Sequence, residues 1–137
     1  MGRKILAILA GIVSALVVIA AIEFASHLVY TPLADMDMND PGAAQQFIAD
    51  LPVGAFLSEL LAYGAATFVG GWVACRVAKE KPLRYAGGIG AVVMLAALAN
   101  SIMIPHPLWF TFAVIVLMPL MAAVASRVAA SSAGQAG

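Results

Sequence analysis

Two carboxylic acids interrupt stretches of this chain that are otherwise apolar and long enough to cross a membrane. Glu23 lies in the run 5–30, and Glu59 lies in the run 51–75. A charge at the centre of a membrane helix costs at least about 2.5–3.5 kcal/mol, so an acidic residue there usually serves a site. The chemistry open to a buried carboxyl group is proton exchange, hydrogen bonding or cation binding.

The spacing of the two acids places them at the same depth. Glu23 precedes Tyr30, at the end of the first run, by seven residues, and Glu59 follows Pro52, at the start of the second, by seven residues. At about 1.5 Å of helix per residue, each lies roughly 10 Å below the same membrane surface. We therefore expect both carboxyl groups in one layer, on helices that are consecutive in the chain.

Other polar groups are expected in this layer. His27 follows Glu23 by four residues, which puts both on one helix face. Asn100 and Ser101 lie about one turn before the end of a third apolar run, and His106 lies in the turn after it. The candidate residues for binding a ligand or proton are Glu23, His27, Glu59, Asn100, Ser101 and His106.

Three interpretations of this cluster remain open. The polar groups could serve structure alone, with Glu23 paired to His27 and Glu59 bonded to Asn100 or Ser101 between helices. They could hold a divalent metal ion, for which the weak candidates are Glu23, His27, Glu59 and His106. They could also line an outward-facing pocket in which burial favours the protonated form of the carboxyl groups.

Several function classes find no support in the sequence. No nucleophile–base set, phosphate loop or complete metal motif occurs, so we expect no enzyme, and the sequence requires no cofactor. The net charge is +0, which argues against nucleic acid as a partner. Cys75 is the single cysteine, so no internal disulfide can form, and we expect it to be a small packing residue.

The elements that must position these residues are predicted to be membrane helices. Hydrophobic residues make up 64% of the 137 residues and charged residues 10%, so the lipid bilayer is the expected partner of this surface. Four apolar runs each approach the roughly 20 residues that span a bilayer. The predicted spans are about 5–30, 52–76, 85–104 and 107–127, within a single domain 1–130 followed by a disordered tail, 131–137.

The loop between the first two spans is acidic, and the charges predict an orientation. Asp35, Asp37, Asp40 and Asp50 lie in this loop, while all seven basic residues fall at the opposite ends of the spans. The positive-inside rule therefore predicts both termini in the cytoplasm of a bacterial cell, with the chain in its inner membrane. Cleavage of the first span as a signal peptide is a weaker alternative, because its apolar run is long.

Within the acidic loop, Asp40-Pro41-Gly42 is typical of a turn. The residues that follow, 43–49, could form a short helix on the membrane surface.

Small residues recur at every fourth position in the second span and predict close helix packing. The stripe comprises Ala62, Ala66, Gly70, Ala74 and Ala78; the first span has Ala7, Gly11 and Ala15, and the third begins with Gly87, Gly88 and Gly90. We expect an all-α, compact antiparallel bundle of four transmembrane helices with the second span at its centre. The same stripe could instead serve a homo-oligomer or a larger membrane complex.

Three segments resemble those of a group of small four-helix bacterial membrane proteins whose activity is not characterised. They are Glu23-x3-His27-x4-Pro32, Gly70-Gly71-Trp72-Val73-Ala74-Cys75-Arg76 and Met103-Ile104-Pro105-His106-Pro107-Leu108-Trp109. The resemblance covers most of the chain and implies a four-span inner-membrane protein. Small multidrug-resistance transporters are similar in size and span number, but here Glu23 lies near the outer end of its helix and an acidic loop follows it.

The sequence thus favours a small inner-membrane protein with an outward-facing polar pocket for a proton, an ion or a small ligand, with transport as one use. The alternative is a non-catalytic accessory or scaffold protein that packs against other membrane proteins or itself. A pocket predicts that Glu23, His27 and Glu59 converge on a void. A scaffold predicts that these groups satisfy one another and that the small-residue stripe faces outward.

Overall fold

The computed structural model describes residues 1–30, 39–79, 82–104 and 106–134, and every regular element in these ranges is a helix. The helices are α1 (Gly2–Val29), α2 (Pro41–Ala49), α3 (Val53–Ala78), α4 (Pro82–Met103) and α5 (Leu108–Gly134). Four of them, α1, α3, α4 and α5, are long and apolar enough to cross a membrane. The prediction of four membrane-length helices that pack together is confirmed.

Some boundaries differ from those expected. Helix α5 continues to Gly134, where we expected a disordered tail from 131; residues 135–137 lie outside the described part. Helix α2 begins at Pro41 because the Asp40 side chain accepts a hydrogen bond from the Gly42 backbone N–H, at 3.0 Å. The Asp-Pro-Gly segment, expected as a turn, is therefore a helix N-cap with proline in the first helical turn. Asp35 and Asp37 lie outside the described residues.

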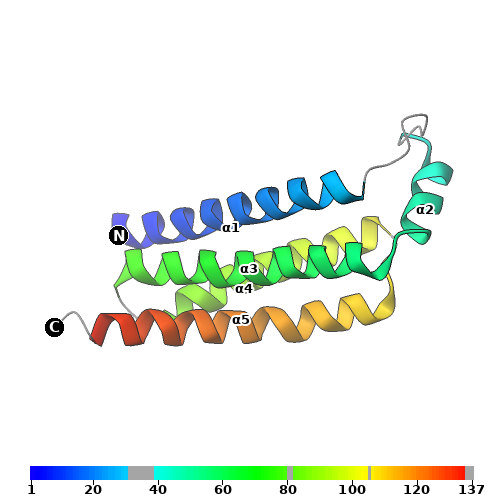
Figure 1. Ribbon diagram of the computed structural model, residues 1–137. Coiled ribbons are helices and arrows are strands. Elements are labelled where there is room, and N and C mark those ends of the chain that lie inside the picture. Colours follow the sequence, from blue (N-terminus) through cyan, green and yellow to red (C-terminus); the bar gives the residue numbers. More distant parts are fainter. Residues whose placement is uncertain (31–38, 80–81, 105, 135–137) are drawn as a thin grey trace.

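The chain reverses direction between successive long helices, so the polar loops gather at two ends of the molecule (Figure 1). The N-terminus, the C-terminal ends of α3 and α5 and the start of α4 lie at one end, which we call the terminal end. Helix α2 and the α4–α5 connection lie at the other, which we call the α2 end. Helix α2 lies across the direction of the long helices rather than along it.

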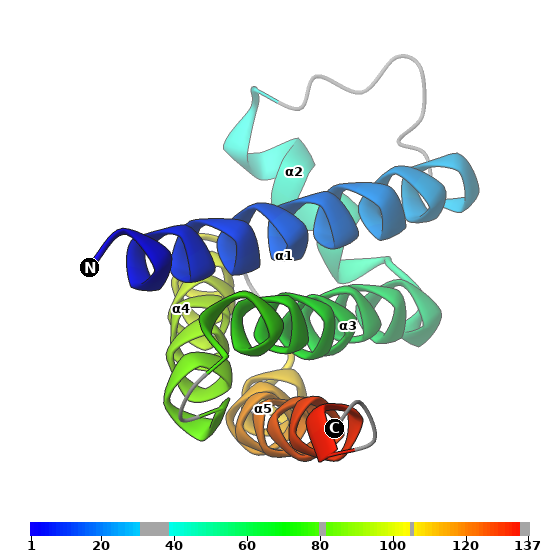
Figure 2. The same cartoon turned by 90° about the vertical axis from the view of Figure 1, so that its left-hand side faces the viewer.

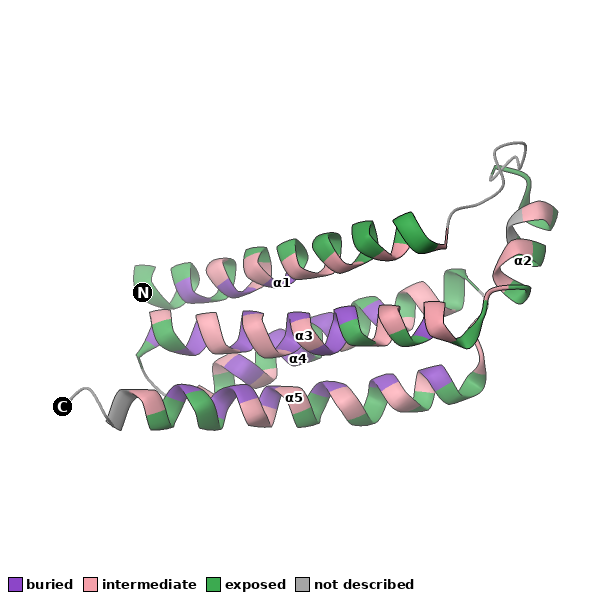
Figure 3. Cartoon of the chain, in the orientation of Figure 1, coloured by how far each residue is buried: buried purple, intermediate pink, exposed green. Residues whose placement is uncertain are grey.

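Helix α3 lies between α1 and α5 (Figure 2). It contacts α1, α4 and α5, whereas α1 and α5 lie on opposite sides of it and do not touch within the described residues (Figure 2). Its small-residue stripe is buried, with Ala62, Ala66 and Ala74 each 0% exposed. Burial is concentrated where the helices face one another, and the outer face of α1 is exposed along its length (Figure 3).

Glycines bring α1 and α3 into close contact. A Cβ atom added to Gly70 would lie 2.6 Å from the Gly11 carbonyl oxygen, and one added to Gly11 would lie 2.8 Å from the Gly70 carbonyl oxygen. Only residues without a side chain allow the two backbones this approach. Gly87, also expected to pack closely, has open space where a Cβ would stand; in α4 the close contact lies at Gly90, against Ala122 of α5.

Candidate functional site

A cavity of about 300 Å³ lies at the α2 end of the molecule. Residues from α1, α2, α3 and α4 and from three connections line it, so it exists only where these segments meet. The lining residues are Glu23, Ser26, His27, Tyr30, Phe47, Ile48, Leu51, Ala55, Phe56, Ser58, Glu59, Asn100, Ile104 and His106. Five of the six candidate residues from the sequence are among them, and Ser101 is not.

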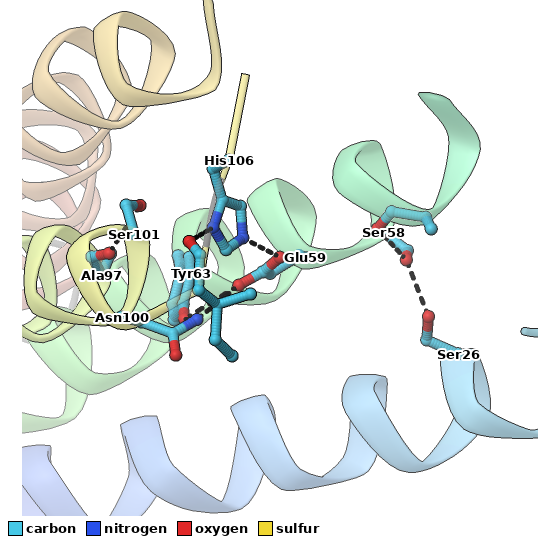
Figure 4. Close-up of polar contacts among 10 residues, drawn as sticks. Ser26, Ser58, Glu59, Tyr63, Ala97, Asn100, Ser101 and His106 are labelled. Atoms are coloured by element: carbon cyan, nitrogen blue, oxygen red, sulfur yellow. Dashed lines mark hydrogen bonds and ion pairs between the residues drawn. The ribbon is translucent and has the colours of Figure 1, made fainter. Parts of the chain in front are cut away.

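Glu59 is the most highly bonded side chain of the cavity wall (Figure 4). One carboxyl oxygen, Oε1, accepts hydrogen bonds from Asn100 Nδ2 at 2.9 Å and from the Tyr63 hydroxyl at 3.2 Å. The other, Oε2, lies 2.9 Å from His106 Nε2. The second hydrogen of the Asn100 amide reaches the Tyr63 hydroxyl at 3.2 Å. We call Glu59, Tyr63, Asn100 and His106 the Glu59 cluster.

The position of one proton in the Glu59 cluster follows from the bonds of His106. Its Nδ1 lies 2.7 Å from the Ile104 carbonyl oxygen, which can only accept, so Nδ1 carries hydrogen. The contact between Nε2 and Glu59 Oε2 then needs one further proton. Either an imidazolium faces a carboxylate, or a neutral imidazole accepts from a carboxylic acid. The net charge of the Glu59–His106 pair is zero in both cases.

Aromatic rings fix the imidazole of His106 in this position. The His106 ring lies 4.7 Å from the Phe110 ring and 5.6 Å from the Phe56 ring, measured between centroids. Its side chain is 3% exposed, against 21% for Glu59. The Trp109 ring stands edge-on to Phe56 at 6.4 Å, so this tryptophan adjoins the cavity wall. Because packed rings surround the imidazole, the geometry of the Glu59–His106 pair is well defined.

Ser26 and Ser58 form the second polar contact of the wall. The Ser58 hydroxyl donates to the Ala55 carbonyl at 2.7 Å, so its oxygen is left as an acceptor. The Ser26 hydroxyl, 2.9 Å away on α1, must therefore be the donor to Ser58. Both hydroxyl hydrogens are engaged within the protein.

Ser101 does not take part in either polar contact. Its hydroxyl donates to the Ala97 carbonyl of its own helix at 2.9 Å and lies away from Glu59 (Figure 4). The sequence offered two partners for Glu59, and Asn100 is the one that bonds it. Ser101 does not reach Glu59 and does not line the cavity.

Glu23 and His27 complete the polar side of the cavity from α1. Both side chains are exposed in the isolated chain. No hydrogen bond reaches this carboxyl group from the part of the chain that the structure describes. Glu23 is thus the cavity's carboxyl group with acceptor capacity to spare.

Much of the remaining cavity lining is apolar. It comprises Phe47 and Ile48 of α2, Leu51 before α3, Phe56 of α3 and Ile104 after α4. Sequence reasoning did not place the α2 residues here, and it missed Tyr63 and Ser26. Tyr63 and Ser26 could have been predicted from their spacing. Tyr63 follows Glu59 by four residues and Ser26 follows Glu23 by three, and these spacings put each pair on one helix face.

The metal interpretation gains nothing from this geometry. Among the described residues, no three side chains of His, Cys, Asp or Glu are grouped so that they could hold a metal ion. His106 and Glu59 are instead bonded to each other and to the surrounding chain. The cavity combines an apolar wall with a few polar groups, as small-molecule sites do.

Comparisons of the chain with protein-family models, with curated proteins and with solved structures give no match.

Proposed function

We propose that this protein is a small multi-pass membrane protein that binds a small ligand in the cavity at its α2 end. The observation that carries the proposal is the cavity itself, which brings Glu23, His27 and Glu59 to one space of about 300 Å³. Void space at a converging set of ionisable groups within membrane helices is expected of a site and is unusual for groups that serve packing alone.

The proposal includes an orientation with the cavity open to the outside of a bacterial inner membrane. Arg3 and Lys4 begin α1, Arg76 and Lys79 end α3, and Arg84 lies in the first turn of α4, so these cations belong to the terminal end. The positive-inside rule assigns that end to the cytoplasm. The α2 end, with Asp40 and Asp50, then faces outward.

Binding is favoured over a purely scaffolding function by the location of the small-residue stripe. A scaffold would present this stripe to another protein, but its members are buried against the chain's own helices. The Glu59 cluster is internally satisfied, as a structural function requires, whereas Glu23 is not. We therefore assign a structural function to Glu59 and a binding function to Glu23.

The test uses three probes that share a phenyl body, namely benzylammonium, benzyl alcohol and benzoate, added to the purified protein in lipid nanodiscs. Trp72→Phe leaves Trp109, beside the cavity wall, as the fluorescent reporter. We expect saturable one-to-one binding of at least one probe. Ala55→Phe, which fills the cavity, should abolish it, while Ala96→Phe on the exposed face of α4 should not.

Thermal unfolding of both variants checks that the added ring has not disrupted the fold. If no probe saturates, or if the two phenylalanine variants bind alike, the cavity is not a binding site.

A further inference from the structure

The hydrogen-bond donors of the Glu59 cluster and of the two serines are committed within the protein, and this limits what that part of the cavity wall can recognise. The hydroxyl hydrogens of Ser26 and Ser58 go to Ser58 and Ala55, as argued above. Both amide hydrogens of Asn100 go to the Glu59 cluster, and so do the Tyr63 hydroxyl and the Nε2 side of His106. The other lining side chains that can donate are His27 and Tyr30. A ligand that needs donors, such as an anion, therefore finds few beside the Glu59 cluster.

The capacity that Glu23 adds to the wall is for accepting hydrogen bonds, and it carries negative charge. Glu59 and His106 together are neutral, because one proton lies between them whichever atom holds it. The Glu23 carboxylate remains, with two oxygens that receive no hydrogen bond from the described chain. A carboxylate in a partly desolvated cavity is best satisfied by a cationic donor, since charge-assisted hydrogen bonds are the stronger kind.

The apolar wall adds a second requirement. Phe47, Leu51 and Phe56 face the same space as Glu23, so a bare inorganic cation would leave this surface uncovered. Aromatic faces also attract cations, which makes the wall compatible with a charged ligand. One ligand satisfies both sides if it carries a cationic head for Glu23 and an apolar body for the rings.

We infer that the cavity selects a small organic cation with N–H donors and an apolar body, of the kind represented by a protonated primary amine. This inference rests on the proposed function and specifies the ligand class of the same cavity. It assigns Glu23, not Glu59, as the residue that holds the charged head. The Glu59 cluster then acts as the neutral, rigid floor beside which the head is bound.

The three phenyl probes distinguish the charge of the head at constant body. Titrations of the Trp72→Phe protein run at pH 8, where free imidazole is mostly neutral and benzylamine is protonated. We expect benzylammonium to bind at least about tenfold more tightly than benzyl alcohol, with benzoate the weakest of the three. This comparison uses one folded protein and needs no variant of the site.

Two carboxamide variants then locate the source of the preference. Glu23→Gln should reduce the ratio of benzylammonium to benzyl alcohol affinity to about one. Asp50→Asn removes a carboxylate from an exposed position at the same end of the molecule, outside the cavity lining, and should keep the ratio. A ratio that falls equally in both variants would show a general surface potential and overturn the assignment of Glu23.

The failures of the two proposals are distinguishable. If benzyl alcohol or benzoate binds as tightly as benzylammonium and Ala55→Phe abolishes that binding, the cation inference is wrong and the binding function stands. If no probe saturates, both are wrong.

Discussion

At the scale of single residues, Glu59 is the carboxyl group that holds the α2 end of the fold together. It joins α3 to α4 through Asn100 and to the α4–α5 connection through His106. Three donors or shared protons converge on its two oxygens, and no buried side-chain nitrogen or oxygen in the described chain lacks a partner. A group with this many contacts contributes to stability mainly through what its removal would leave unpaired.

Substitutions at Glu59 should therefore depend on hydrogen-bonding shape more than on charge. Glu59→Ala strands Asn100, Tyr63 and His106 and should lower the free energy of unfolding by about 2–3 kcal/mol. This is less than the 3–5 kcal/mol of a fully buried pair because Glu59 is 21% exposed. Glu59→Gln should cost less than about 1 kcal/mol, since its amide can donate to Nε2 of a neutral His106 while its oxygen still accepts from Asn100.

Equilibrium unfolding of the purified variants in mixed micelles measures both values. Ser101→Ala is the matched control, because this hydroxyl bonds only its own helix backbone, and it should change stability by less than about 0.5 kcal/mol. A loss for Glu59→Gln as large as that for Glu59→Ala would contradict the expectation that hydrogen-bonding shape matters more than charge at this position.

At the scale of elements, the contact between α1 and α3 depends on backbone proximity at Gly11 and Gly70. Helix α1 buries only its small-residue face, formed by Ala7, Gly11 and Ala15, and exposes large side chains elsewhere. No hydrophobic force drives helices together inside lipid, so close packing of this face is what holds α1 in place. The position of Glu23 relative to α3 follows from it.

Gly70→Leu should push α1 away from α3, because a Cβ there already meets the Gly11 carbonyl oxygen at 2.6 Å. We expect a loss of about 1–3 kcal/mol in the free energy of unfolding, typical of overpacking. The same unfolding measurement on Gly88→Leu is the control, since a Cβ at Gly88 has nothing within 4 Å. Equal losses in both variants would mean that leucine destabilises these helices at any glycine position. The contact between Gly11 and Gly70 would then contribute nothing particular to stability.

At the scale of the whole molecule, charge and polarity are separated between the two ends. Five basic residues, Arg3, Lys4, Arg76, Lys79 and Arg84, belong to the terminal end, and the cavity and α2 belong to the other. In a membrane the two ends of the molecule would therefore meet different environments. Under the proposed function, the orientation determines from which side a water-soluble ligand reaches the cavity.

The orientation predicts which single cysteines a membrane-impermeant maleimide can reach in intact cells. In a Cys75→Ser background, Gln45→Cys on the exposed face of α2 should be labelled from outside. Lys79→Cys, at the end of α3, should be labelled only after the membrane is opened, because we propose that it faces the cytoplasm. The reverse pattern would invert the topology and place the cavity on the cytoplasmic side.

The sequence by itself determined the number of membrane-length helices, because long apolar runs in lipid leave the backbone no alternative to internal hydrogen bonds. It also indicated a close-packing face on α3, since small side chains repeated at every fourth residue define a face without any tertiary information, and these residues are buried. Counting helical rise from the ends of two adjacent spans predicted that Glu23 and Glu59 share one depth, and both line the same cavity.

Only the tertiary structure decided which polar groups meet. Asn100 and Ser101 are neighbours in the chain, yet a helix turns by about 100° per residue, so one reaches Glu59 and the other bonds its own backbone. Helix α4 is apolar on nearly all sides, so its sequence pattern does not fix how it rotates about its axis. Packing against α3 and α5 sets that rotation, and the path of two short connections brings His106 and α2 to the same cavity.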